Sequence, residues 1–147
     1  MEITEIEQES QRMQADIIQM SGIHPSECAC ETCQSMCRKT PCVGTPLEMY
    51  LIGEHPEFAN KLALTMSLAS LQLGLPPMVV SAPIFNETEK CCSFFVGGKC
   101  QLHEKGLKPL EGKLANCRPD TKLINATLMI YQSWLPLQKR LITQFFK

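Results

Sequence analysis

Residues 28–42 read CACETCQSMCRKTPC and hold five of the nine cysteines of the chain. The last four of these five are spaced as Cys30-x2-Cys33-x3-Cys37-x4-Cys42. At such spacings several sulfurs can close on one ion at about 2.3 Å each, as tetrahedral zinc requires, and the same soft ligands suit an iron–sulfur cluster. The stretch has little apolar periodicity and cannot bury a hydrophobic face of its own. We therefore expect a metal to order it.

Four more cysteines follow this cluster. Taken alone, Cys92, Cys100 and Cys117 each fit a small core residue as well as a ligand, but beside the first cluster they become candidates to complete its site or to form a second one. Cys91 and Cys92 are adjacent in a segment that we expect to be extended, so their side chains should face opposite ways. We expect Cys92 to be the inward one. His103, three residues after Cys100, is the best candidate for a ligand other than cysteine.

The composition is that of one globular domain spanning residues 1–147, with 44% hydrophobic and 20% charged residues. The formal net charge of -1 provides no basic field for nucleic acid or for an acidic membrane. No apolar run approaches the roughly 20 residues that would span a bilayer. The N-terminal residues, MEITE, are acidic and polar, unlike a secretory signal peptide, so we expect a cytoplasmic protein.

The expected cytoplasmic location decides how the cysteines are interpreted. In a reducing compartment, dense thiols are more often metal ligands or catalytic groups than disulfides. Nine cysteines also cannot all pair within one chain. A disulfide framework and a set of reduced, buried thiols are the alternatives to a metal site.

The rest of the pattern predicts a mostly helical fold with one short β-hairpin. Apolar spacing and capping signals indicate flanking helices, a short helix that Thr45, Pro46 and Glu48 begin, and an apolar helix at the centre of the core. We expect a hairpin around the turn Gly97-Gly98 and a loop with solvated lysines, and Pro136 should break the last helix. The expected ranges are helices over 2–21, 45–53, 55–73 and 121–147, a hairpin over 92–103 and a loop over 104–120.

Two blocks of this sequence resemble the YkgJ-type zinc- or iron-chelating proteins. The first block is Cys30 to Cys37 with the following PCVGTPLE of residues 41–48, and it is similar to the family's CxxCxxCC signature. The second is CSFF at 92–95 with GKCQLHE at 98–104, and GLKPLEG at 106–112 with Cys117-Arg118 stands in the place of the family's closing segment. The resemblance covers residues 28–118. The chain departs from the signature because three residues separate Cys33 from Cys37 and no Cys-Cys pair closes the first block.

The resemblance implies metal chelation but no established reaction. It implies a cysteine-rich metal-binding region over residues 28–118, between flanking helices over 2–21 and 121–147. The cysteines that it implies as metal ligands are Cys30, Cys33, Cys37, Cys42, Cys92, Cys100 and Cys117.

Three functional hypotheses follow. The first is a small metal-binding protein that holds zinc or iron through clustered thiolates, and the second is an iron–sulfur protein with a redox or accessory role in a modification pathway. The third is a thiol enzyme with one hyper-reactive cysteine. The sequence contains no HExxH, no GxSxG and no phosphate-binding glycine loop, and it does not decide whether the protein is an enzyme. The apolar end of the chain, residues 141–146, is compatible with a homodimer or a protein partner.

Overall fold

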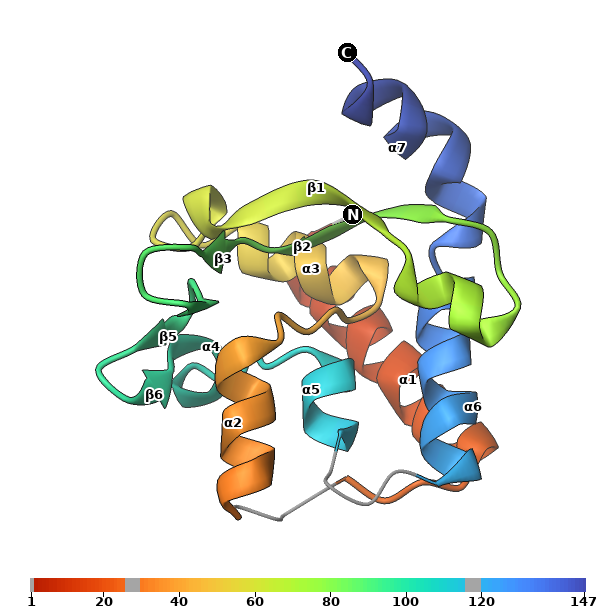
Figure 1. The fold of residues 1–147 in the computed structure, drawn as a ribbon. Helices are drawn as coiled ribbons and strands as arrows, with labels where there is room; N and C mark the ends of the chain where they lie inside the picture. The colour runs from red at the N-terminus through yellow and green to blue at the C-terminus, as the bar shows by residue number, and fades with distance from the viewer. Residues whose placement is uncertain (1, 26–29, 116–119) are drawn as a thin grey trace.

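The computed structural model describes residues 2–25, 30–115 and 120–147, except for the side chains of Gln34 and Cys37 within a helix. In these ranges the chain is mostly helical, with small two-stranded antiparallel sheets, as the sequence predicts (Figure 1). The helices are α1 (Ile3–Ser21), α2 (Glu31–Lys39), α3 (Pro46–Gly53), α4 (Gln101–Glu104), α5 (Leu110–Leu114), α6 (Thr121–Gln132) and α7 (Gln138–Phe145), with 3-10 turns η1 (Ala59–Lys61), η2 (Ala69–Leu73) and η3 (Leu135–Leu137). The strands are β1 (Leu62–Ser67), β2 (Met78–Pro83), β3 (Phe85–Asn86), β4 (Cys91–Cys92), β5 (Phe95–Val96) and β6 (Lys99–Cys100).

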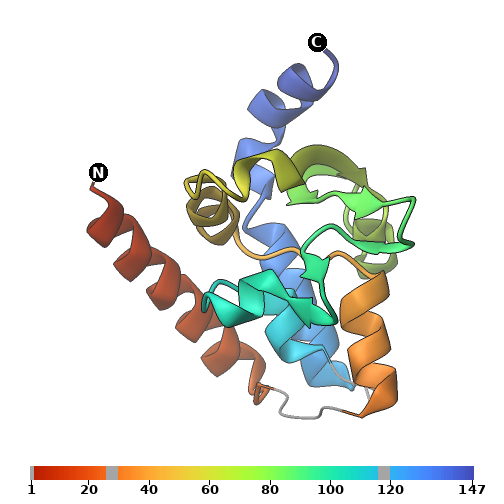
Figure 2. The same ribbon diagram turned by 90° about the vertical axis from the view of Figure 1, so that its left-hand side faces the viewer.

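The long N-terminal helix forms where its apolar spacing predicts it. α1 buries Ile6 and Ile17 and packs against α3 and α6. It ends where Gly22 adopts a left-handed conformation (φ 74°) and donates its N–H to the carbonyl of Ile18. Figure 2 shows the N-terminal end of α1 projecting beyond the rest of the molecule.

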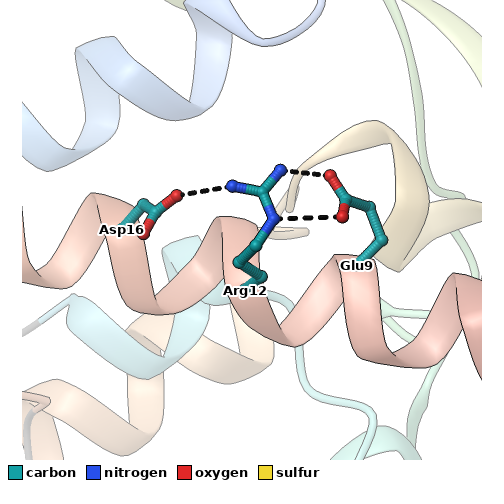
Figure 3. Close-up of polar contacts among 3 residues, drawn as sticks. All are labelled: Glu9, Arg12 and Asp16. Atoms are coloured by element: carbon teal, nitrogen blue, oxygen red, sulfur yellow. Dashed lines mark hydrogen bonds and ion pairs between the residues drawn. The ribbon is translucent and has the colours of Figure 1, made fainter.

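Three charged residues on the outer face of α1 form an ion-pair network (Figure 3). Arg12 lies between Glu9 and Asp16, to which it donates at 2.9 Å, and all three residues are solvent-accessible. Exposed pairs of this kind contribute little to stability. The position of α1 is therefore set by its buried apolar side chains and not by this ion-pair network.

The predicted apolar helix over 55–73 is wrong. Residues Leu62–Ser67 form β1, which pairs with β2 from Leu62↔Pro83 to Ser67↔Met78. The same residues alternate with period two: Leu62, Leu64 and Met66 are partly buried, whereas Ala63 and Thr65 are exposed. The β-favouring run Met78–Val80 supplies a partner strand, and this pairing outweighs the helical propensity of the leucines.

The predicted hairpin forms, but it is shorter than expected. β5 and β6 pair around Gly97 and Gly98, which both have positive φ angles (62° and 81°). Cys92 does not belong to this hairpin, because β4 pairs with β3. His103 lies beyond it, in α4.

Two further helices lie where the sequence indicates none. α2 crosses the cysteine cluster, with Glu31 in its first turn and Arg38 and Lys39 in its last, the arrangement that the helix dipole favours. α5 interrupts the predicted 104–120 loop. Two other predicted boundaries are confirmed. α3 begins at Pro46, and the C-terminal helix breaks at η3, which contains Pro136.

The buried apolar side chains form two clusters. The larger one surrounds β2, where Met78, Val79 and Val80 are 0–1% exposed, and it includes Phe58 and Phe94. The core is therefore centred on β2 and not on residues 62–73. The second cluster lies between α1, α5 and α6. No helix in the described ranges has both the length and the apolarity needed to cross a membrane.

Candidate metal-binding site and cavity

The loop that carries Cys42 is fixed to α5 and to the turn that follows α6. Val43 donates its N–H to Oε1 of Glu111 at 3.0 Å, and Glu111 in α5 donates its own N–H to the Val43 carbonyl at 3.3 Å. Trp134 donates its indole N–H to the Gly44 carbonyl at 2.9 Å. These bonds satisfy buried backbone groups and set the Cys42 thiol beside α5.

Gly112 provides the space for this thiol. A Cβ atom built at Gly112 would lie 2.7 Å from Sγ of Cys42 and 3.0 Å from Cε of Lys108, closer than such contacts allow. Any larger residue would displace the thiol or the lysine stem. The glycine in the quoted GLKPLEG block is thus explained by a close approach of Cys42 to the helix.

Three cysteines from distant segments lie close enough to affect one another's protonation. Burial raises the pKa of the Cys42 thiol well above its ordinary value, and the charges of Glu111, Cys92 and Cys100 raise it further, while Lys108 lowers it. Burial also raises the pKa of Cys92, and Cys100 again contributes. Loop 40–45, β4 and β6 therefore converge on one group of thiols.

This group adjoins a cavity of about 1350 Å³. Cys33 of α2, Cys42 and Cys100 all line it, and the exposed His103 of α4 stands on its rim. The sheet β1–β2 forms another wall. The first cysteine block and the second thus contribute to the walls of one space.

The remaining predicted ligands have different surroundings. Cys30 is exposed at the start of α2, and Cys92 is 7% exposed within the larger core cluster. Cys91 is equally buried, and its thiol points to the Phe95 carbonyl at 3.8 Å. The expectation that Cys92 is the inward one of the pair is therefore not confirmed, because both side chains are buried, although only Cys92 belongs to the larger core cluster. Three predictions lie outside the described residues: Cys28, Cys117 and the side chain of Cys37.

The described residues alone do not make a complete coordination shell. Among them, no set of three or more Cys, His, Asp or Glu side chains is arranged so that it could hold a metal ion. What these residues do show is that Cys33, Cys42 and Cys100 line one cavity, and that Cys92, in the core cluster, acts on the Cys42 thiol. These four cysteines are the candidate ligands among the described residues.

Sequence reasoning did not find the polar residues beside the thiols. Glu111 accepts a hydrogen bond from the Tyr131 hydroxyl, and burial raises its pKa to about 7 although the bonds from Val43 and Tyr131 oppose this shift. Lys108 is half-buried on the cavity wall and is not a solvated loop lysine. The local sequence carries no signal for this placement, because it results from the contact between α5 and the loop that carries Cys42.

No family model, no curated protein and no solved structure matches this chain. The resemblance to the YkgJ-type proteins therefore stays a prediction, and the function is argued from the residues themselves.

Proposed function

We propose that this chain is a metal-binding protein that holds zinc or iron through clustered cysteine thiolates. The observation that carries the proposal is that three segments of the chain bring Cys42, Cys92 and Cys100 into one region, where the charges of Cys92 and Cys100 raise the pKa of Cys42 and that of Cys100 raises the pKa of Cys92. Cys33 lines the same cavity as two of them. Sulfur donors from loops and strand ends are the ligand type that zinc and iron–sulfur centres use, and binding would have to draw these thiols together.

The protonation state of these thiols is compatible with binding zinc or iron. A buried thiol with a raised pKa stays protonated on its own, but coordination to a metal deprotonates it. The same raised pKa values give no support to the thiol-enzyme hypothesis at Cys42 or Cys92, because the thiolate is the nucleophilic form. Binding would release protons and would join the first cysteine block to the second. Cys30, Cys37 and Cys117 are the further ligands that the family resemblance implies.

The alternative function is an iron–sulfur protein with a redox or accessory role. The same thiolates would hold the cluster, so the two functions differ in the metal and not in the residues. The metal itself distinguishes them. A zinc protein is colourless, whereas an iron–sulfur protein absorbs visible light and contains acid-labile sulfide.

The test is elemental analysis of protein purified without oxygen, with a visible spectrum of the same sample. We expect stoichiometric zinc or iron in the wild type and a large loss of metal in Cys42→Ser and Cys100→Ser. Cys91→Ser is the matched control, because this buried thiol points to the Phe95 carbonyl, and it should keep its metal. Iron with sulfide and visible absorbance would favour the alternative function. Trace metal in a wild type whose thiols are fully reduced would refute both.

A further inference from the structure

The cavity is far larger than a metal site needs. A metal ion surrounded by its ligands leaves almost no free volume, whereas this cavity measures about 1350 Å³. Pockets for small organic ligands usually measure about 300–1,000 Å³. Cys33, Cys42 and Cys100 are only a small part of its lining, so most of the cavity is available to another occupant.

The wall opposite the helices is made of small side chains. In the sheet β1–β2, Ala63 is paired with Ala82 and Thr65 with Val80, and all four residues line the cavity. Figures 1 and 2 show this sheet above α2 and α5, which lie beside each other. The larger side chains of β1 lie at the alternate positions. The paired strands thus leave an apolar floor with room above it.

One charged group on the wall has no partner of opposite charge. Lys108 runs over Gly112 beside Cys42, is half-buried, and makes no hydrogen bond or ion pair within the described residues. The carboxylates that line the same cavity do have partners. These partners are Lys90 for Glu87 (3.8 Å), Lys99 for Glu104 (3.9 Å), and the N–H of Val43 for Glu111 (3.0 Å).

We propose that the cavity binds an apolar organic carboxylate, with its hydrocarbon body on the floor of sheet β1–β2 and its head group at Lys108. Lys108 is a half-buried residue of the cavity wall, and a carboxylate in a partly dehydrated cleft would give its ammonium group the counter-charge that the described residues do not supply. The small floor residues accept a chain or ring that larger side chains would exclude. This site goes beyond metal binding and does not require the metal.

The experiment is titration calorimetry with decanoate and with 1-decanol, which share one body and differ in the head group. The wild type should bind decanoate saturably and at least about tenfold more tightly than decanol, a difference of about 1.4 kcal/mol. Acetate, which has the head group alone, should not bind measurably. Failure of the wild type to bind decanoate, or equal affinity for decanol, would overturn the proposal.

Substitutions at Lys108 and Thr65 test which residue contacts the head group of the ligand and which contacts its hydrocarbon body. Lys108→Met keeps the apolar stem and should lower decanoate affinity at least about tenfold while leaving decanol unchanged. Lys105→Met is the matched control, since this exposed lysine pairs with Glu57 at 3.8 Å outside the cavity, and it should bind as the wild type does. Thr65→Phe fills the floor from an exposed strand position and should weaken both ligands.

Metal content, measured on the same variants, separates this site from the metal-binding function. Lys108 also affects the Cys42 thiol, so its charge has a second conceivable role, that of balancing the charge of a thiolate centre. If Lys108→Met loses metal but binds decanoate unchanged, the lysine serves the thiols and the carboxylate site is refuted. If it keeps metal and loses decanoate, the carboxylate site stands whatever the metal proves to be.

Discussion

The α1–α5–α6 side of the molecule and the β3–β6 side are stabilised in different ways. In the first, helices of 19 and 12 residues bury a continuous seam that includes Ile17, Ala126 and Ile130, and α5 adds two leucines. In the second, four strands of two residues each form two small ladders. Isolated two-stranded ribbons are marginal in water even when they are longer.

This difference shows how far each side depends on contacts with the rest of the chain for its stability. The helical side buries enough apolar surface to hold its elements together. The β3–β6 side is attached to the main core chiefly through the fully buried Phe94, whose ring meets Phe58 edge-on with centroids 5.3 Å apart. The thiols of Cys92 and Cys100 are on this weaker side. A metal bound there would supply the cohesion that the short strands lack.

The largest expected effect is that of Phe94→Ala. Removing a fully buried phenylalanine leaves a cavity and should cost about 3–5 kcal/mol in the free energy of unfolding. Phe146→Ala is the matched control because Phe146 is 71% exposed, and its cost should stay within about 0.5 kcal/mol. Urea unfolding of both variants measures the two costs. A cost below that of a surface substitution would show that Phe94 does not anchor the β3–β6 side.

The second prediction concerns the contact between α5 and loop 40–45. Burial raises the pKa of Glu111 from its ordinary value of 4.5 to about 7, so the folded state binds the proton more tightly than the unfolded state does. The resulting stability is fully present below pH 4.5 and is lost as the pH rises to 7. Glu111→Gln keeps an acceptor for Val43 and should remove this loss, which is about 3 kcal/mol at most.

The measurement is the pH dependence of unfolding in metal-free protein. Glu111→Gln should be more stable than the wild type at pH 7 and nearly equal to it at pH 4. Glu48, whose pKa burial also raises, remains in both proteins and contributes the same residual slope to each. Parallel curves for the two proteins would show that Glu111 is not desolvated as its position indicates.

The elements that depend on local signals were predictable from the sequence. α1, the start of α3, the turn at Gly97-Gly98 and the break at Pro136 follow from apolar spacing, capping residues and backbone restrictions that act within a few residues. The segment 62–73 was not predictable in this way. Its leucines fit both a helix and a strand, and only pairing with Met78–Val80, a long-range contact, decides between them.

In the candidate site, too, the features that depend on local sequence were predictable and those that depend on long-range packing were not. The density and spacing of the cysteines pointed to soft-metal chemistry, and the structure places Cys33, Cys42 and Cys100 on one cavity. Nothing in the local sequence reveals that Lys108 and Glu111 face this cavity, because their positions result from the packing of α5 against loop 40–45. α2 was missed for a different reason. Its Cys33, Met36 and Cys37 have helical spacing, but the cysteines were interpreted as ligands in a loop that a metal orders.

The smallest expected effect is the change in stability when a helical glycine is replaced by alanine. Whether that change is stabilising or destabilising tests how closely Cys42 packs against α5. In a helix, Gly→Ala is usually stabilising by up to about 1 kcal/mol. At Gly53 of α3 a new Cβ would meet only Cδ1 of Leu62 at 3.7 Å, so Gly53→Ala should be neutral or stabilising. At Gly112 the new Cβ would lie 2.7 Å from Sγ of Cys42.

Gly112→Ala should therefore destabilise the protein by about 1–2 kcal/mol, because the hydrogen-bonded loop cannot move away to accommodate the methyl group. It should also lower the metal content, since the displaced thiol is Cys42. Urea unfolding and elemental analysis of the two alanine variants, side by side, give both readouts. If Gly112→Ala matched Gly53→Ala in both, Cys42 would not pack against α5, and the thiol group would lose the contact that joins it to the helical side.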